Sequence, residues 1–222
     1  MDRWITDGRS VLDNSRYPKL PARLLANSRI LPDRADILPL IPKGGVIIEV
    51  GVAFGDFSRK ILDICQPRKF IAIDIFDLHE QPTLWGKDTA TLFSGKTHAD
   101  FYRHRFTAEC QAGQVELIAA HSALALETLP DHAADVIYLD AEHSYEAVTR
   151  DLAICARKIH ENGWLILNDY TPAEAGFTNI PYGVIQACHE FMLAHDWEMT
   201  HLSLAWVMYC DVVLRKFSRT AA

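Results

Sequence analysis

Short apolar runs recur along the chain, and most of them carry an acid at or next to their last position. The runs cover residues 46–50, 69–74, 114–120, 134–140 and 164–169, and the acids are Glu49, Asp74, Asp140 and Asp169. Nearly continuous apolar runs are typical of parallel strands that are buried on both faces. The pattern therefore predicts a parallel sheet with acidic residues gathered along its carboxyl edge.

Helical periodicity separates these runs. Apolar positions at helical spacing predict helices over residues 56–64, 97–108, 124–129, 144–159 and 181–191. Thr97 and Ser144 are expected to cap two of them, and Asn162-Gly163 is expected to stop the fourth. Residues 197–204 and 207–214 suit an antiparallel hairpin at the sheet edge. The predicted fold is α/β, a doubly wound Rossmann-like sheet that is mostly parallel and has an antiparallel C-terminal hairpin.

Two segments fall outside this alternation. Residues 1–42 contain five prolines and one short predicted helix, so we expect an N-terminal arm rather than a domain. The arm would pack on the core, on a partner subunit of a homo-oligomer, or at the site entrance. Residues 75–97 are too long for an ordinary connection and predict a lid or substrate wall. Trp85 in this insertion would either stack on an adenine or sugar ring, or pack into the core.

Composition narrows the functional classes. The 222 residues are 49% hydrophobic, enough for one sizeable domain over residues 43–222. A net charge of -7 without a Lys/Arg run disfavours nucleic acid as a partner. No apolar stretch approaches the roughly 20 residues that span a bilayer, and the N-terminus lacks a signal-peptide core, so we expect a cytoplasmic protein without a membrane partner. The 5 scattered cysteines favour reduced thiols over disulfides or a zinc site.

The first predicted strand leads into a Gly-x-x-x-Gly turn. Gly51 and Gly55 permit a sharp turn and leave no side chain between the main chain and a ligand. Asp74 closes the second strand, where an acid commonly hydrogen-bonds ribose hydroxyls. An acid at a strand end is also often only a helix cap, but the glycine turn upstream favours ribose binding.

The acids of the last two runs are expected to meet. Neighbouring strands lie about 4.8 Å apart, so the tips would bring Asp140 and Asp169 together, where two unpaired carboxylates repel each other. A hard cation such as Mg²⁺ would resolve that conflict. Protonation of one acid, or hydrogen bonds to loop amides or to Arg/Lys, would resolve it as well.

Several segments in order resemble the class I S-adenosylmethionine-dependent methyltransferases, and within them the metal-dependent O-methyltransferases of sugars and natural-product hydroxyls. The segments are 49–55, the strand tip at Asp74, 139–146 and 163–170, and 183–191 also fits. The resemblance spans residues 46 to about 215. It implies a seven-stranded sheet whose last strand is antiparallel.

The resemblance also implies roles for individual residues. The implied cofactor-binding residues are Glu49, Gly51, Phe54 and Gly55 near the methionine part, Asp74 at the ribose, His121 and Ser122 at the adenine, and Asp140. The implied metal ligands are Asp140, Asn168 and Asp169. Many relatives carry an acid pair where Asn168-Asp169 stands, and an aspartate where Glu142 stands.

The implied reaction is methyl transfer to a hydroxyl of a small molecule, such as a sugar or natural product, assisted by a divalent metal. A hydroxyl or vicinal diol that is bound to the metal would lose its proton more easily. Glu142 and His143 are the proton-acceptor candidates, although a lone histidine here is equally expected to pack against the next helix. Tyr170 and the loop 171–180 are expected substrate contacts. The alternatives are a metal-free methyltransferase that uses Glu142 or His143, and a non-catalytic protein of the same fold that binds cofactor or a partner. A nicotinamide dehydrogenase is disfavoured because its Gly-x-Gly-x-x-Gly fingerprint is absent.

Overall fold

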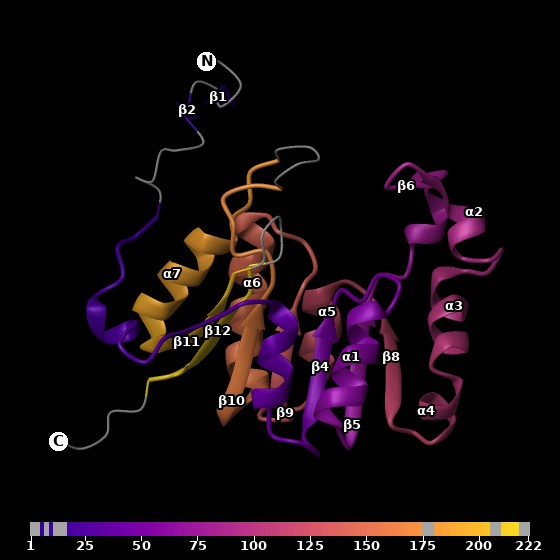
Figure 1. Cartoon of the computed structure of the whole chain (residues 1–222), viewed down its shortest axis with the longest axis horizontal. Coiled ribbons are helices and arrows are strands. Elements are labelled where there is room, and N and C mark those ends of the chain that lie inside the picture. The colour runs from indigo at the N-terminus through magenta and orange to yellow at the C-terminus, as the bar shows by residue number, and fades with distance from the viewer. Residues whose placement is uncertain (1–4, 7–8, 11–16, 175–179, 205–209, 218–222) are drawn as a thin grey trace.

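A mixed β-sheet forms the centre of the protein. The computed structural model describes residues 5–6, 9–10, 17–174, 180–204 and 210–217. The strand order of the 8-stranded sheet in this part is β3-β11-β12-β10-β9-β4-β5-β8 (Figure 1). The strands are β3 (Arg29–Leu31), β4 (Val46–Val50), β5 (Lys69–Asp74), β8 (Val115–Ala119), β9 (Ala134–Leu139), β10 (Ile159–Leu167), β11 (Trp197–Ser203) and β12 (Val212–Lys216).

The predicted doubly wound fold is confirmed. Strands β8, β5, β4, β9 and β10 run parallel, and their order reverses direction at β4 and β9. Strand β12 lies antiparallel between β10 and β11. In sheets of this kind, ligands bind outside the carboxyl ends of the parallel strands. All four acids predicted to follow that edge lie within two residues of the ends of β4, β5, β9 and β10.

The expected count of seven strands is wrong, because the N-terminal arm adds an eighth. Strand β3 pairs in parallel with residues 201–203 of β11 and forms one edge of the sheet. The arm also contains the short 3₁₀ helices η2 (Ala22–Leu24) and η3 (Arg34–Leu40). Two small strands, β1 (Ile5–Thr6) and β2 (Arg9–Ser10), pair with each other. Three placements of the arm are expected from the sequence, and residues 29–40 take the first of them, because they pack on the core.

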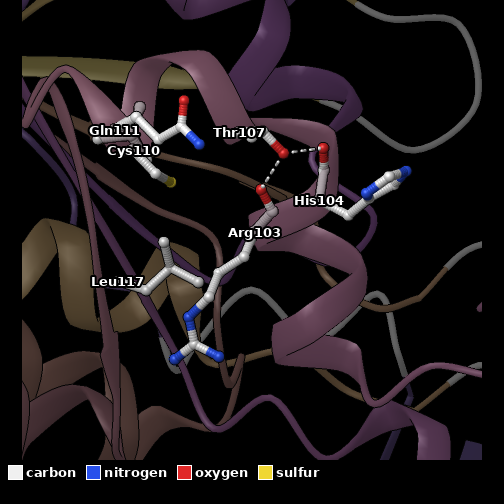
Figure 2. A pocket seen from close by; sticks show the side chains of 7 residues that line it. Arg103, His104, Thr107, Cys110, Gln111 and Leu117 are labelled. Atoms are coloured by element: carbon white, nitrogen blue, oxygen red, sulfur yellow. Dashed lines mark hydrogen bonds between the residues drawn. The ribbon is translucent and has the colours of Figure 1, made fainter.

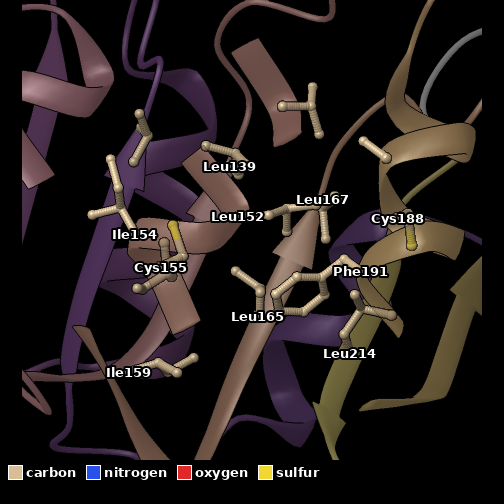
Figure 3. Packing of buried hydrophobic residues seen from close by; sticks show 14 of the residues in the cluster. Leu139, Leu152, Ile154, Cys155, Ile159, Leu165, Leu167, Cys188, Phe191 and Leu214 are labelled. Carbon is tan, nitrogen blue, oxygen red and sulfur yellow. The ribbon is translucent and has the colours of Figure 1, made fainter. Parts of the chain in front are cut away.

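Two apolar clusters cover the two faces of the sheet. One joins it to α5 (Ser122–Thr128), α6 (Tyr145–Lys158) and α7 (Val184–His195). The other joins it to η3, α1 (Asp56–Cys65), α3 (His98–Arg105) and α4 (Thr107–Gln111). Figure 3 shows side chains of β9, β10 and β12 meeting those of α6 and α7, namely Leu139, Leu165, Leu167, Leu214, Leu152, Cys155 and Phe191. Each fully buried aliphatic side chain contributes about 1.5–3 kcal/mol to folding.

Most helix boundaries agree with the predictions, and the exceptions have packing causes. Thr97 and Ser144 cap α3 and α6 as expected, through their side-chain oxygens. Helix α6 ends at Lys158 rather than at Asn162-Gly163, because the buried Ile159 already pairs with Ala134 of β9. The helix expected over 97–108 is divided at residue 106, and α7 begins at Val184 rather than at residue 181. The last strand begins at Val212, and residues 205–209 of the expected hairpin lie outside the described residues.

The insertion at residues 75–97 has its own structure. It contains η4 (Leu78–Glu80), the β6–β7 hairpin (Thr83–Leu84 and Lys87–Asp88) and α2 (Thr89–Leu92), which lie together above α3 (Figure 1). No helix in the described part of the chain is long and apolar enough to cross a membrane. Cys65, Cys155 and Cys188 are buried, as the sequence predicts for structural thiols.

Candidate functional site

The glycine turn after β4 packs against the tip of β9. Gly51 has a φ of +86°, and a Cβ at this position would lie 1.9 Å from the carbonyl oxygen of Asp140. Gly55 has a φ of +79°, and its Cβ would meet the rings of Phe106 and Tyr102 at 2.7 and 2.9 Å. Both glycines are therefore required by the protein's own packing, in addition to any role in letting a ligand approach the main chain.

Asp74 organises the loops on the other side of β4. Its carboxylate accepts hydrogen bonds from the backbone amides of Val52 (2.8 Å) and Phe76 (2.9 Å). Its carbonyl oxygen accepts a bond from the amide of Ala120, directly before His121. A carboxylate has about four lone-pair directions, so two amide donors leave capacity for ribose hydroxyls. The structure thus brings Asp74, the glycine turn and the start of α5 together.

His121 and Ser122 begin α5 at that junction. His121 is exposed and makes no side-chain cap, and the hydroxyl of Ser122 accepts a long bond of 3.4 Å from Arg150. Both residues lie at the tip of the strand beside Asp74, where the resemblance places the adenine.

Glu49 points away from this surface into the core. It is 2% exposed and accepts a short hydrogen bond from Ser58 of α1. Burial raises the pKa of Glu49 to about 8, against the opposing effects of that bond and of the Arg34 charge. The residue therefore holds the start of α1 against β4, and its role in cofactor binding stays a prediction.

Trp85 lies at the tip of the β6–β7 hairpin, over the glycine turn. Its side chain is 62% exposed, and its ring meets that of Phe54 edge-on at 5.6 Å. Phe54 also packs against Phe93 and Phe101. The alternative that Trp85 packs into the core is wrong, and an exposed aromatic surface remains beside the turn.

An arginine from the arm reaches the acidic edge of the sheet. The Nη1 atom of Arg34 lies 3.6 Å from Oδ2 of Asp140 and donates to the hydroxyl of Tyr138 at 3.2 Å. Burial would lower the pKa of Arg34, but Tyr138, Asp140 and Asp211 outweigh it and raise that pKa above its usual value. Burial raises the pKa of Asp140, whereas the charge of Arg34 acts in the opposite direction.

A buried hydrogen-bond chain continues from Tyr138. Its hydroxyl donates to Oδ2 of Asp211 at 2.6 Å, and Nδ2 of Asn168 donates to Oδ1 of the same carboxylate at 2.9 Å. Asp211 is fully buried, and this burial raises its pKa to about 7. Since β12 is antiparallel, the residue before it lies at the same edge as the carboxyl ends of β9 and β10. Asn168, a predicted metal ligand, is thus tied to Asp211.

His143 faces the two acids from the loop after β9. Its Nε2 atom lies 3.8 Å from Oδ1 of Asp140 and 3.8 Å from Oδ2 of Asp169, and it is buried without a hydrogen-bond partner. The imidazole stacks on Tyr182 at 4.6 Å, and Tyr182 hydrogen-bonds Asp169. Burial lowers the pKa of His143 to about 4 and raises the pKa of Asp169 to about 6. At neutral pH the imidazole is uncharged and lies beside an ionised carboxylate.

Two of the predicted site residues have other partners. Glu142 is exposed and accepts a bond of 2.6 Å from Ser144, the cap of α6. The hydroxyl of Tyr170 pairs closely with Nε2 of His189, whose Nδ1 lies 2.7 Å from the carbonyl oxygen of Pro18. Of the two proton-acceptor candidates, His143 is therefore the one that faces the acids.

The residues of this edge do not fit a divalent metal. Among the described residues, no group of three or more His, Cys, Asp and Glu side chains converges closely enough to hold an ion. Arg34 already places a positive charge beside Asp140, and a second cation there would be repelled. The sequence gives no signal for Arg34, which lies in the arm. An acid directly before a terminal antiparallel strand is a signal for Asp211 that the sequence reasoning missed.

A separate cavity lies away from this edge. A shallow pocket of about 410 Å³ lies between α3, α4 and the first half of β8 (Figure 2). Arg103, Cys110 and Leu117 contribute to its lining, and none of the strand-tip acids does. The acidic edge, rather than this pocket, is the candidate site.

Comparison with known proteins identifies the family of this chain. A family profile described as a methyltransferase domain matches residues 48–170, more than half of the chain. No curated protein sequence matches the chain significantly.

Many solved structures share the fold at low identity. A precorrin-6y C5,15-methyltransferase from Geobacter metallireducens has a TM-score of 0.56 and 12% identity, over 82% of this chain and 86% of that one. A SAM-dependent methyltransferase from Aquifex aeolicus has a TM-score of 0.54 and 13% identity, over 82% and 89%. The tRNA methyltransferase TrmK from B. subtilis has a TM-score of 0.52 and 15% identity, over 86% and 68%. With the profile match, the chain belongs to the methyltransferase-domain family and is a class I S-adenosylmethionine-dependent methyltransferase.

Proposed function

We propose that this methyltransferase transfers a methyl group to a hydroxyl of a small molecule, such as a sugar or a natural product, with His143 as the base. The observation that carries the proposal is the buried Nε2 atom of His143, which has no partner and lies 3.8 Å from each of two acids. Buried polar atoms are nearly always paired, so an unpaired one at a strand tip favours a missing substrate group.

The electrostatics suit proton transfer. A pKa of about 4 keeps His143 neutral at pH 7, so Nε2 is available to accept the proton of an acceptor hydroxyl, and a nearby carboxylate is needed to offset the weak basicity that burial imposes. The carboxylate of Asp169, whose pKa is about 6, would then stabilise the imidazolium. The cofactor, when bound, supplies an electrophilic methyl group on a sulfonium. As the hydroxyl oxygen bonds to that methyl, the carbon–sulfur bond breaks, and the products are a methyl ether and S-adenosylhomocysteine.

Residues on the other half of the edge would hold the cofactor. Asp74 would accept the ribose hydroxyls while its amide bonds keep the glycine turn in place. His121 and Ser122 would border the adenine. Trp85 and Phe54 offer an exposed aromatic surface on the same side. These assignments rest on the positions of the residues and on the resemblance of their motifs.

The acceptor is proposed to be small and uncharged or cationic. A net charge of -7 and the acids at the strand tips would repel a phosphate backbone. We propose the metal-free version of the reaction over the magnesium-assisted one, because Arg34 already places a positive charge beside Asp140.

Two measurements test the function. Calorimetry with S-adenosylmethionine should show binding that weakens about tenfold or more in Asp74→Asn and is unchanged in Asp77→Asn, an exposed acid nearby. A mass-spectrometric screen should then find a gain of one methyl group on a hydroxylated small molecule. Absence of cofactor binding would favour a non-catalytic protein. Methylation of tRNA or rRNA fragments alone would overturn the acceptor class.

A further inference from the structure

We infer that Arg34 is a positioning residue of the reaction, and that it supplies from the N-terminal arm a positive charge beside Asp140 in the place that a metal ion would otherwise take. The inference rests on the proposed function, because it assigns the charge compensation of the same site. It follows from the path of the arm, the contacts of the guanidinium, and the position of Asp140 between Arg34 and His143.

The arm holds the backbone of Arg34 firmly. Arg34 is the first residue of η3, whose start is fixed by a capping box between Asp33 and Asp36. Ile37 and Leu38 of the same helix are buried against α1 at 1% exposure each. A reciprocal cap and two buried anchors leave little freedom to the residue between them.

The side chain is fixed as well. Its guanidinium lies over the ring of Phe57 at 4.3 Å, and the side chain is 20% exposed. Its Nη1 atom bonds Tyr138, and so joins the buried chain that ends at Asp211 and Asn168. Stacking and hydrogen bonding together orient the planar guanidinium more firmly than a lysine ammonium could be oriented.

Asp140 connects Arg34 to the proposed base. One carboxylate oxygen, Oδ2, lies 3.6 Å from Arg34, and the other, Oδ1, lies 3.8 Å from Nε2 of His143. The positive charge of Arg34 acts against the burial that raises the pKa of Asp140, and the contact holds the carboxyl group facing the imidazole. Arg34 thus acts on the chemistry through Asp140, without touching the reacting atoms.

A further consequence concerns metal binding. With Arg34 in place, the acids that the structure describes at this edge do not converge on one point. Removal of Arg34 would leave Asp140 and its neighbour Asp169 without that cation and free to turn toward an ion. Carboxylate oxygens in such surroundings attract Mg²⁺ or Mn²⁺. The arginine and a divalent cation are therefore alternatives for one position, and the wild-type chain has the arginine.

The first test uses Mn²⁺ as the probe. In electron paramagnetic resonance at neutral pH, wild-type protein should leave the signal of free Mn²⁺ unchanged, whereas Arg34→Gln should deplete it and the double variant Arg34→Gln/Asp140→Asn should not. Depletion by wild type that disappears in Asp140→Asn would overturn the inference. An unchanged signal with Arg34→Gln would also overturn it. This readout needs no acceptor, so it is independent of the proposed function.

The second test is kinetic and uses the acceptor found in the screen. Arg34→Gln should lower kcat about 100-fold and leave cofactor affinity unchanged, and Arg34→Lys should recover part of the loss. Arg59→Gln is the matched control, since Arg59 also pairs with an acid, Glu109, and stacks on a ring, Phe106, away from the site. Equal losses in Arg34→Gln and Arg59→Gln would contradict a positioning role. If Arg34→Gln does not fold, the kinetics of Arg34→Lys and the Mn²⁺ measurement on the wild-type protein still test the inference.

Discussion

His143 and Asp169 face each other across the tips of β9 and β10, with Nε2 3.8 Å from Oδ2. Both residues have an unsatisfied buried atom, Nε2 in His143 and Oδ1 in Asp169. Asp169 also has a φ of +53°, a conformation that costs a non-glycine residue about 1–2 kcal/mol. Unpaired polar atoms and backbone strain at one point are typical of functional sites rather than of structural ones.

Substitution of His143 by alanine should abolish most of the activity. General-base catalysis contributes about 10²- to 10⁴-fold, so kcat should fall by that factor while cofactor affinity stays constant. His160→Ala, at the opposite end of β10, is the control and should retain full activity. Steady-state kinetics and calorimetry on both variants check the expectation. A kcat within threefold of wild type would show that His143 is not the base.

Glu49 should make stability depend on pH. Its pKa is about 8 in the folded protein and 4.5 when unperturbed, so the folded state keeps a proton that the unfolded state has lost. The contribution of Glu49 to stability should therefore be fully present below about pH 4.5 and be lost as the pH rises to about 8, by up to roughly 5 kcal/mol. Glu49→Gln keeps an oxygen for Ser58 and removes the titration, so its thermal unfolding should be less sensitive to pH. Parallel curves for wild type and Glu49→Gln would contradict this prediction.

Gly51→Ala should be far more damaging than the same change at another glycine of positive φ. The new Cβ would lie 1.9 Å from the carbonyl oxygen of Asp140 and force the tips of β4 and β9 apart. The cost should exceed about 3 kcal/mol, as is seen when buried backbone must move. Gly113 also has a positive φ, but its Cβ would meet nothing within 4 Å, so Gly113→Ala should cost only about 1–2 kcal/mol. Urea unfolding of the two variants tests the difference, and similar losses would disprove it.

Trp85→Asn should separate stability from binding. Trp85 and Gly86 both have positive φ in the two-residue turn between β6 and β7, where Asn-Gly is the favoured sequence. The change should leave the free energy of unfolding equal or raise it by up to about 1 kcal/mol. Affinity for the cofactor or the acceptor should fall, since the exposed aromatic surface is lost. Wild-type affinity for both ligands would exclude Trp85 from the site.

The local parts of the fold could be predicted from the sequence. Apolar runs, caps such as Ser144 and the acid at Asp74 depend on neighbouring residues, so periodicity and spacing locate them. The eighth strand and the end of α6 depend on pairing instead. Strand β3 is only three residues long and forms because β11 offers it an edge, and Ile159 leaves the helix because β9 offers it a partner.

The site was predictable only where it follows the strand tips. Asp140, His143 and Asp169 meet because parallel strands end at one edge. Arg34 reaches them from an arm, 104 positions before its hydrogen-bond partner Tyr138, and no spacing rule connects the two. The predicted magnesium site depended on treating the acids as unpaired, and Arg34 removes that premise.

The proposed mechanism transfers a methyl group to a small-molecule hydroxyl with His143 as the base and Arg34 as a positioning residue, without a metal ion. The most direct test incubates the wild-type chain with S-adenosylmethionine and a panel of hydroxylated small molecules, in the presence of EDTA, and measures methylated product by mass spectrometry. We predict equal product with EDTA and with added Mg²⁺, and loss of product in His143→Ala under both conditions. Product that forms only with Mg²⁺, or that persists in His143→Ala, would contradict this mechanism.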